Sequence, residues 1–211
     1  MYKVIRMVKR GDKLPGEFRQ EWLEHNRELR KTAAGGLKVG VLADAKIFGE
    51  EKAPFDGMAT LYFSTAAEAA KAEDKSIGKG AVSLVAEEKP LFERPNVTLK
   101  TNGQLKVVLT VVRKKGLSPA QFKDLALKAY NKVDSKAIVA SPIQKIVASF
   151  AVPQPGESPF FDGMIELYFA GPDQIKAAFA SPVIGLLRRD EETYVQMDAP
   201  ELRLVIEEHV P

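Results

Sequence analysis

The sequence predicts an α+β protein made of two ferredoxin-like βαββαβ repeats packed sheet to sheet within one chain. FDGMATLYF at residues 55–63 recurs as FDGMIELYF at 161–169, an offset of 106. LPGEF at 14–18 aligns with SPAQF at 118–122, an offset of 104, so a whole small domain is repeated rather than a short solenoid unit. The strand-like segment 107–112 is apolar on both alternating faces, which indicates that both faces of its sheet are covered.

Each copy is expected to contain the same six elements in the same order. The strands are rich in Val, Ile and Leu, the first helix has a proline in its first turn, and the second helix is rich in alanine. The first copy is expected to contain strand 3–9, helix 15–31, strands 37–48 and 57–63, a helix from about Thr65, and a last strand at 96–101. The second copy is expected to contain strand 105–113, helix 119–133, strands 143–151 and 163–169, a helix from about Pro172, and a last strand at 201–208.

The two copies are expected to be residues 1–103 and 104–211, with a small insertion near 153–156. Segments 80–93 and 186–199 have no clear pattern, although part of the first fits either a strand or a helix. Because each sheet needs its apolar face covered, we expect the copies to form an intramolecular pseudo-dimer. Further homodimer formation through exposed strand edges stays open.

The composition excludes several classes of site and partner. The 211 residues include no cysteine and two histidines, so disulfides, iron–sulfur clusters, thiol nucleophiles and a histidine-rich metal site are excluded, and no metal is expected. The 31 Lys and Arg residues are spread along the chain, so no nucleic-acid partner is expected. No apolar run approaches the roughly 20 residues of a membrane span, and the start lacks the apolar centre of a signal peptide. We therefore expect no membrane partner and a cytoplasmic protein.

Taken together, these motifs resemble the EthD domain family. The family pattern is a strand, a Pro-x-x-Phe helix with a histidine seven residues after the Phe, an FDG-x-x-x-LYF strand and an Ala-rich helix; here the histidine is His25. The resemblance implies a single-chain dimeric α+β barrel and a role in the metabolism of small organic molecules, often labelled oxidoreductase. Relatives with this barrel include cofactor-free monooxygenases, lactone isomerases and haem-binding enzymes, so the fold does not fix the reaction.

The helix at 15–31 carries the main catalytic candidate. One stripe of it, at spacings of four, three and four, holds Phe18, Trp22, His25 and Leu29. The stripe predicts that His25 points toward the sheet rather than into water. There the His25 side chain would act as an acid, a base or a polar anchor for the substrate. Phe18 and Trp22 would then contact an apolar substrate. The alternative is a histidine that only fills space and hydrogen-bonds a backbone carbonyl or a carboxylate.

The second copy has small residues at the same places, with Ala126 opposite Trp22 and Ala129 opposite His25. Unfilled core volume is destabilising, so we expect larger neighbours to refill most of this space. The candidates for refilling are Tyr130, Phe150 and Phe179. The functional pocket is therefore expected in the first copy, with the second mainly a structural partner.

Two aspartates, Asp56 and Asp162, each precede a glycine at the start of a strand. Asp-Gly is common turn chemistry, which favours a structural role for both. Asp56 is also the second catalytic candidate, because it could orient His25 if its loop folded over the helix.

Polar side chains interrupt the apolar strands and are expected to meet inside the sheets. They are Arg6, Thr60, Tyr62, Glu166 and Tyr168, with Thr110 the counterpart of Arg6. Because an unpaired buried charge is costly, Arg6 and Glu166 are expected to pair across the two sheets. A polar lock between the copies is favoured over a binding site, in which Arg6 and Tyr62 would contact the substrate.

Three functions remain open on the sequence. The first is an enzyme that binds a small, fairly apolar organic molecule beside His25; the others are a metabolite-binding module and a stress-related scaffold. No cofactor is expected, and haem bound through His25 is a lesser alternative. The charge run at 188–192 is expected to be a solvated helix face or loop, and His209 a solvated chain end.

Overall fold

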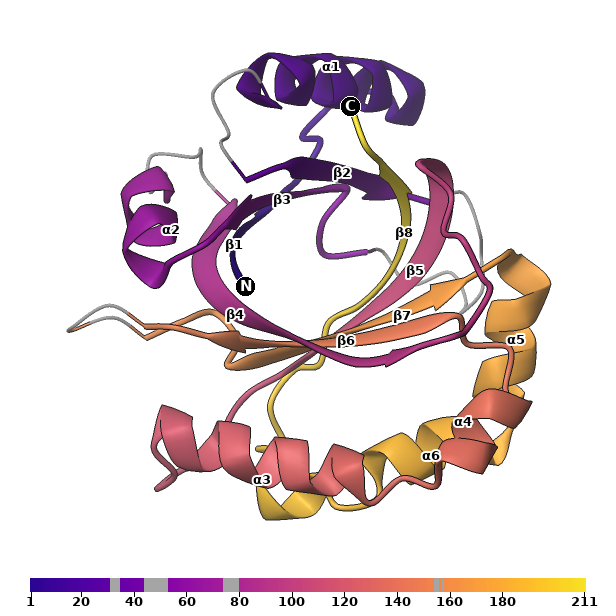
Figure 1. Ribbon diagram of the computed structural model, residues 1–211. Helices are drawn as coiled ribbons and strands as arrows, with labels where there is room; N and C mark the ends of the chain where they lie inside the picture. The colour runs from indigo at the N-terminus through magenta and orange to yellow at the C-terminus, as the bar shows by residue number, and fades with distance from the viewer. Residues whose placement is uncertain (31–34, 44–52, 74–79, 154–155, 157) are drawn as a thin grey trace.

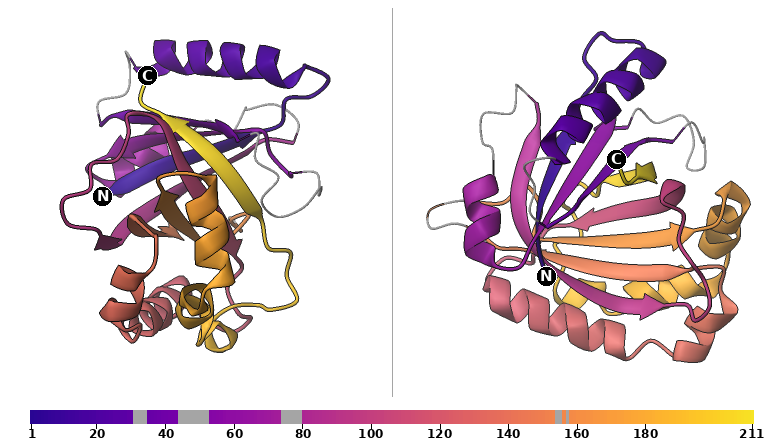
Figure 2. Two further views of the ribbon diagram at one scale, coloured as in Figure 1. Left: turned by 90° about the vertical axis from the view of Figure 1, so that its right-hand side faces the viewer. Right: turned by 45° about the horizontal axis from the view of Figure 1, so that its top comes forward.

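The computed structural model describes residues 1–211 except 31–34, 44–52, 74–79, 154–155 and 157. Eight strands form a closed antiparallel barrel, with helices on its outside (Figure 1). The long helix α1 lies on one side of the barrel, and the group α3–α6 lies on the opposite side (Figures 1 and 2). The expected mixed α+β fold is confirmed.

Both halves of the chain follow the order βαββαβ, and the second half has extra helical turns. The first half consists of β1 (Tyr2–Val8), α1 (Pro15–Arg30), β2 (Leu37–Leu42), β3 (Gly57–Phe63), α2 (Ala66–Ala72) and β4 (Val82–Glu93). The second half consists of β5 (Asn102–Val111), α3 (Pro119–Asn131), α4 (Ser135–Ala140), β6 (Lys145–Ala151), β7 (Gly163–Phe169), α5 (Pro172–Ala180), α6 (Pro182–Arg188), the 3-10 turn η1 (Glu191–Thr193) and β8 (Arg203–His209). Capping boxes begin α2 and α3, because the Thr65 and Ser118 side chains accept from backbone N–H groups that the helix leaves unpaired.

The barrel consists of two four-stranded sheets that are joined at both edges. The strand order is β4-β1-β3-β2 in the first half and β8-β5-β7-β6 in the second. Hydrogen bonds between β2 and β8, and between β4 and β6, close the ring. No strand of the ring is therefore left with a free edge, and the two halves share backbone hydrogen bonds as well as an interior.

The last strand of the first half lies elsewhere than expected. It is β4 at Val82–Glu93, whereas residues 96–101 belong to no helix or strand. Pro90 sits at an irregularity between β4 and β6, because proline has no N–H to donate to the ladder. The expected boundary between residues 103 and 104 falls inside β5, and the connection at 94–101 separates the halves instead. Part of the expected strand 37–48 and of the insertion at 153–156 lies outside the described residues.

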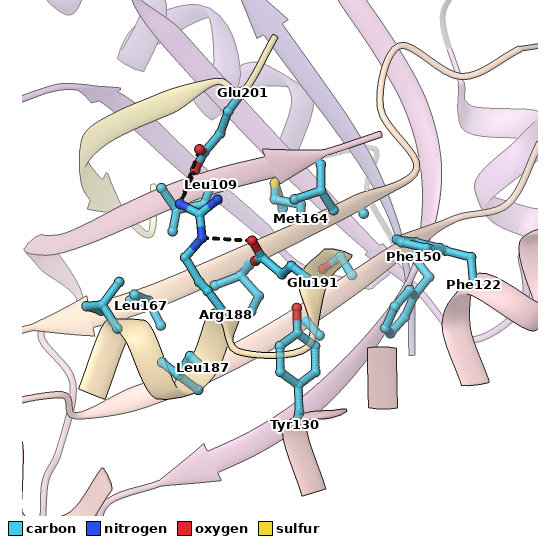
Figure 3. A pocket seen from close by; sticks show the side chains of 16 residues that line it. Leu109, Phe122, Tyr130, Phe150, Met164, Leu167, Leu187, Arg188, Glu191 and Glu201 are labelled. Carbon is cyan, nitrogen blue, oxygen red and sulfur yellow. Dashed lines mark hydrogen bonds and ion pairs between the residues drawn. The ribbon is translucent and has the colours of Figure 1, made fainter. Parts of the chain in front are cut away.

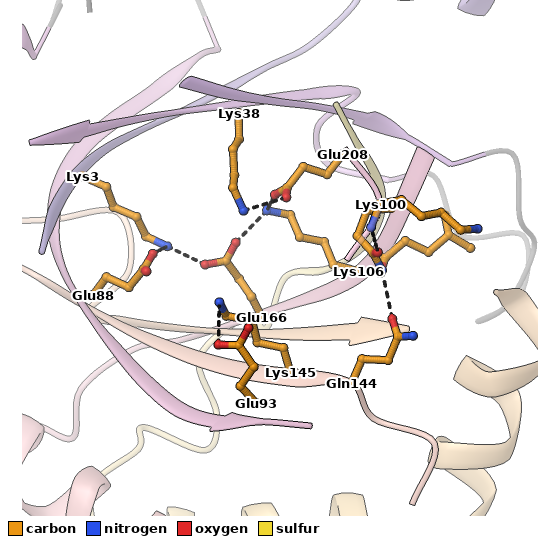
Figure 4. Close-up of polar contacts among 12 residues, drawn as sticks. Lys3, Lys38, Glu88, Glu93, Lys100, Lys106, Gln144, Lys145, Glu166 and Glu208 are labelled. Carbon is orange, nitrogen blue, oxygen red and sulfur yellow. Dashed lines mark hydrogen bonds and ion pairs between the residues drawn. The ribbon is translucent and has the colours of Figure 1, made fainter. Parts of the chain in front are cut away.

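The barrel interior has an apolar end and a charged end. The apolar end is filled by side chains from both halves, including Ile5, Met7, Met58, Leu84, Val108, Met164 and Ile206. The charged end contains lysines and glutamates (Figure 4). Outside the barrel, α1 and α2 cover one apolar cluster of the first half, and α3, α5 and α6 cover two clusters of the second. Among the described helices, none has the length and apolar character that crossing a membrane requires.

Candidate functional site

The candidate site is a small cavity in the second half, between the outer face of the sheet and the helices. Its volume is about 20 Å³, roughly enough for one water molecule. Its wall is mainly apolar and comes from β5, β6, β7, α3 and α6, with labelled side chains Leu109, Phe122, Phe150, Leu167 and Leu187 (Figure 3). The site lies on the helix-covered face, so it is separate from the barrel interior.

The small residues of α3 help to explain the shape of this region. Ala126 and Ala129 are buried against Phe150 and Tyr194. Phe122 packs edge-on against Phe150, with ring centroids 5.9 Å apart, and lies at the same distance from Tyr194. The predicted refilling by Phe150 and Tyr130 is therefore seen, whereas Phe179 belongs to another cluster. Tyr194 is the aromatic residue that sequence reasoning missed.

Arg188 joins two glutamates at the cavity. Its Nε donates to Oε2 of Glu191 at 2.8 Å, and its Nη1 lies 3.2 Å from each carboxylate oxygen of Glu201 (Figure 3). Glu191 is 7% exposed, whereas Glu201, just before β8, is exposed. Burial raises the pKa of Glu191, Arg188 opposes this effect, and the charge of Glu201 adds to it. The cavity thus has a buried carboxylate that holds a proton more readily than an exposed one.

Two tyrosines complete the polar part of the site. The Tyr130 hydroxyl points toward Glu191 (Figure 3). Burial raises the pKa of Tyr130 and of Tyr194 well above the usual value, and the charge of Glu191 raises both further. The hydroxyls of these two tyrosines also act on each other, and this contact raises the pKa of Tyr130 and lowers that of Tyr194. Both phenols therefore stay protonated near neutral pH, and they can donate a hydrogen bond to an oxygen atom of a bound molecule.

The sequence pattern gave the wrong orientation for His25. Its ring is exposed and stacks on Trp22, with centroids 6.2 Å apart. Asn26 is the fully buried residue of this helix turn, and its Nδ2 donates to the Trp22 carbonyl at 2.7 Å. Phe18, Trp22 and Asn26 recur every four residues, and this spacing turns His25 to the edge of the buried stripe. Its role as acid or base stays a prediction.

Phe18 and Trp22 fill the space between α1 and the sheet. Phe18 stacks on Trp22 at 6.0 Å, and Trp22 Nε1 donates to the Gly40 carbonyl at 3.1 Å. A side chain at Gly57 would come within 2.8 Å of Phe18 Cζ. The two aromatic rings are packed directly on the strand backbone, and their contact with a substrate stays a prediction.

Asp56 and Asp162 hold equivalent loops in the two halves. Asp56 Oδ2 accepts from the Arg10 backbone N–H at 3.0 Å, and its other oxygen lies 3.5 Å from Arg10 Nε. Asp162 accepts from the Arg113 backbone N–H at 2.8 Å and from Arg113 Nε at 3.0 Å. This geometry agrees with the structural role that the turn chemistry favours, and it directs Asp56 toward Arg10 rather than His25.

Arg6 lies outside the barrel, not inside it as predicted. In β1 it stands opposite Ala59, and its Nη2 donates to the Ala72 carbonyl at 3.0 Å beside α2. Lys3 stands opposite Tyr62, just as Lys106 stands opposite Tyr168 in the other half. The first strands are thus offset by 103 residues, not 104, and a shift of one residue moves a side chain to the other face.

The expected pair of Arg6 and Glu166 is therefore wrong, and lysines take the place of the arginine. Glu166 accepts from Lys3 at 2.5 Å and from Lys106 at 2.7 Å. The chain of ion pairs continues on both sides, in the order Glu88, Lys3, Glu166, Lys106, Glu208 and Lys38 (Figure 4). Tyr62 is buried beside this chain of ion pairs in the barrel interior, whereas Arg6 lies on the outer face of the sheet. The two side chains therefore point to opposite faces.

Two further expectations from the sequence were wrong. The charge run at 188–192 is not merely a solvated face, because it supplies Arg188 and the buried Glu191 to the cavity. His209 is not a free chain end, because it pairs in β8 and its Nε2 lies 3.0 Å from Glu207 Oε1. No pattern in the sequence distinguishes Glu191 from its exposed neighbour Glu192.

The comparisons with known proteins concern the second half of the chain and the overall fold. The sequence model of the EthD domain family matches residues 114–198, which include α3, β7, α6 and η1. No curated protein sequence matches the chain at a significant level.

Similar solved structures cover nearly the whole chain at very low sequence identity. One is an anthrone oxidase-like protein, with a TM-score of 0.58, 9% identity, and coverage of 98% of this chain and 90% of that one. Another, named as a candidate monooxygenase from Lactobacillus acidophilus NCFM, has a TM-score of 0.53, 11% identity, and coverage of 98% and 92%. A third, a major regulator of staphylococcal pathogenesis, has a TM-score of 0.55, 7% identity, and coverage of 100% and 99%. At such identities the similarity concerns the fold alone.

Proposed function

Since the model of the EthD domain family matches residues 114–198 of this chain, we propose that the protein binds a small, largely apolar organic molecule in the second-half cavity. We propose further that it removes a proton from one carbon atom of this molecule and returns it to the same or another carbon atom. The observation that carries this proposal is Glu191, a buried carboxylate with a raised pKa at a mainly apolar cavity. Titratable groups perturbed by burial and by a charged partner within a cavity are candidates for catalysis.

In the proposed step, the Glu191 carboxylate removes a proton from a carbon atom next to a carbonyl group of the bound molecule. The electron pair of the C–H bond moves toward the carbonyl oxygen, and the Tyr130 hydroxyl donates a hydrogen bond to that oxygen. Return of the proton from Glu191 to the same or another carbon atom completes an exchange or an isomerisation. Arg188 holds Glu191 in place through its Nε and needs no change of charge. The family's link with small-molecule metabolism supports this class of reaction.

The test is deuterium exchange into 2-indanone, a small ketone with acidic C–H bonds, followed by proton NMR in D₂O. We expect the wild-type protein to accelerate the exchange over buffer, and E191Q to reduce that acceleration by at least about 100-fold, as for loss of a general base. E192Q is the matched control, because Glu192 is the exposed neighbour of Glu191 on η1. Equal exchange in the wild-type protein and E191Q would refute the proposed role of Glu191.

A second candidate function is binding without chemistry. The hydrogen bond from Arg188 Nε to Glu191 Oε2 at 2.8 Å favours it, because this bond occupies one of the two oxygens that a general base would use. This function predicts that E191Q retains ligand affinity and that the wild-type protein leaves 2-indanone exchange at the buffer rate.

We further infer that the two halves are copies of one EthD-type unit. Both follow the order βαββαβ, and both seat a helix phenylalanine, Phe18 or Phe122, on the glycine of the FDG motif. The loops held by Asp56 and Asp162 also have the same hydrogen bonds. These shared details support duplication more strongly than the element order alone, because βαββαβ units also occur in unrelated proteins.

A further inference from the structure

Arg188 already holds a carboxylate at the edge of the cavity, and that carboxylate is held loosely. Both Glu201 oxygens lie 3.2 Å from a single nitrogen, Nη1, whereas Glu191 lies 2.8 Å from Nε. The Glu201 side chain is 29% exposed. Within the described part of the chain, no residue accepts a hydrogen bond from Nη2 of Arg188. The Nη1–Nη2 edge of the guanidinium therefore offers more donors than Glu201 uses.

Glu201 has a second cation within reach. Its Oε2 lies 3.9 Å from Nη2 of Arg203, which follows two residues later. When Glu201 leaves Arg188, its carboxylate thus keeps a positive neighbour and gains water. Since the pair is partly exposed, its loss costs little.

We propose that the ligand of this cavity is a small organic carboxylate, which replaces Glu201 on Arg188 and places its apolar body against the cavity wall. This inference rests on the proposed function and names its substrate class. A ligand carboxylate can accept from Nη1 and Nη2 together, a bidentate arrangement that Glu201 does not reach. Glu191 keeps its hydrogen bond from Nε of the same guanidinium. Arg188 would therefore hold the ligand carboxylate on its Nη1–Nη2 edge and the proposed base, Glu191, on its Nε edge.

Replacement of Glu201 by the ligand carboxylate also opens the cavity. Arg188 ends α6, and Glu191 begins η1, so both lie on one wall. The Arg188–Glu201 pair ties this wall to the segment before β8. The cavity has a volume of only about 20 Å³, so an aromatic ring can enter only after the wall moves outward. Replacement of Glu201 by the ligand breaks the Arg188–Glu201 ion pair and so allows this movement.

The experiment measures the affinities of two probes of similar size, benzoate and the neutral benzyl alcohol, by isothermal titration calorimetry. We expect E201Q to tighten benzoate binding by about 3- to 10-fold, because a competing charge is removed. We expect R188Q to weaken benzoate binding by at least about 10-fold, because it loses the charged hydrogen bonds. Benzyl alcohol should change by less than about twofold in both variants. E192Q and R189Q are matched controls at neighbouring exposed residues and should leave both affinities unchanged.

Distinct outcomes overturn this inference and the proposed function. Benzyl alcohol binding with no effect of R188Q or E201Q on benzoate overturns the carboxylate inference and leaves the proposed function standing. Failure of both probes to bind the wild-type protein overturns both. If R188Q does not fold, R188K, which keeps the charge but loses the planar edge, and E201Q still decide the result. A crystal structure with benzoate should show its carboxylate on Nη1 and Nη2, and Glu201 turned toward Arg203.

Discussion

Lys3 in β1 and Glu166 in β7 form an ion pair at 2.5 Å across the inside of the barrel, joining residues 163 positions apart. Both side chains are essentially excluded from solvent. Glu166 also accepts from Lys106 of its own half, so one carboxylate is shared between a lysine from each half. The two halves are thus bound together by a buried charged group as well as by strand edges.

Removing Glu166 should destabilise the protein more than replacing an exposed glutamate. E166Q leaves two buried lysines with one fewer counter-charge, and breaking such a pair costs about 3–5 kcal/mol. Urea unfolding of E166Q and of E24Q, a matched control on the exposed face of α1, measures the difference. A free energy of unfolding within about 0.5 kcal/mol of wild type in E166Q would show that the ion pairs contribute little. Benzoate affinity should stay unchanged, since the barrel interior is separate from the cavity.

Acid should weaken the same cluster in a predictable direction. Burial alone would raise the pKa of Glu166, but Lys106 and Lys3 hold it well below its usual range, and Lys106 and Lys38 lower the pKa of Glu208. A carboxylate with a lowered pKa in the folded state stabilises it above its unfolded value of about 4.5, and this stabilisation is lost as the pH falls below that value. Urea unfolding at pH 7, 5, 4 and 3 should therefore show a smaller acid loss in E166Q than in the wild-type protein. Parallel curves would contradict this explanation.

The glycine of each FDG motif should be intolerant of a side chain. A Cβ at Gly57 would lie 2.8 Å from Phe18 Cζ, and one at Gly163 would lie 2.9 Å from Phe122 Cζ. G57A and G163A should each lower the free energy of unfolding by about 1–3 kcal/mol, as for overpacking of a core. G16A is the control, because a Cβ there meets no atom within 4 Å. If G57A unfolds at the same urea concentration as G16A, the close approach of α1 is not a constraint.

The fold was predictable from the sequence where local patterns agree with tertiary structure. Apolar strands, a proline at the start of α1 and α3, and the repeated FDG motif all indicate elements that the structure contains. β4 was missed because Pro90 and charged residues interrupt its alternation. The side of the sheet to which Arg6 points was predicted wrongly, because an alignment error of one residue moves every side chain of a strand to the opposite face.

The candidate site was less predictable, because its chemistry depends on burial. Glu191 and Glu192 are adjacent in sequence, and only the packing of η1 against α3 and Arg188 buries the first. On α1, a difference of one position separates the buried Asn26 from the exposed His25. Helical spacing locates a stripe, but the edge of the stripe depends on how the helix rolls on the sheet.

Replacing His25 decides between the first-half and second-half sites. Because its ring is exposed and contacts Trp22 on one side, H25A should change the free energy of unfolding by no more than about 0.5 kcal/mol, as for most surface substitutions. It should also leave the exchange of 2-indanone and the affinity for benzoate unchanged. The control for a stability effect is W22A, which removes the ring packed on the strand and should cost about 3–5 kcal/mol. Loss of exchange in folded H25A, with exchange intact in E191Q, would return the catalytic role to α1.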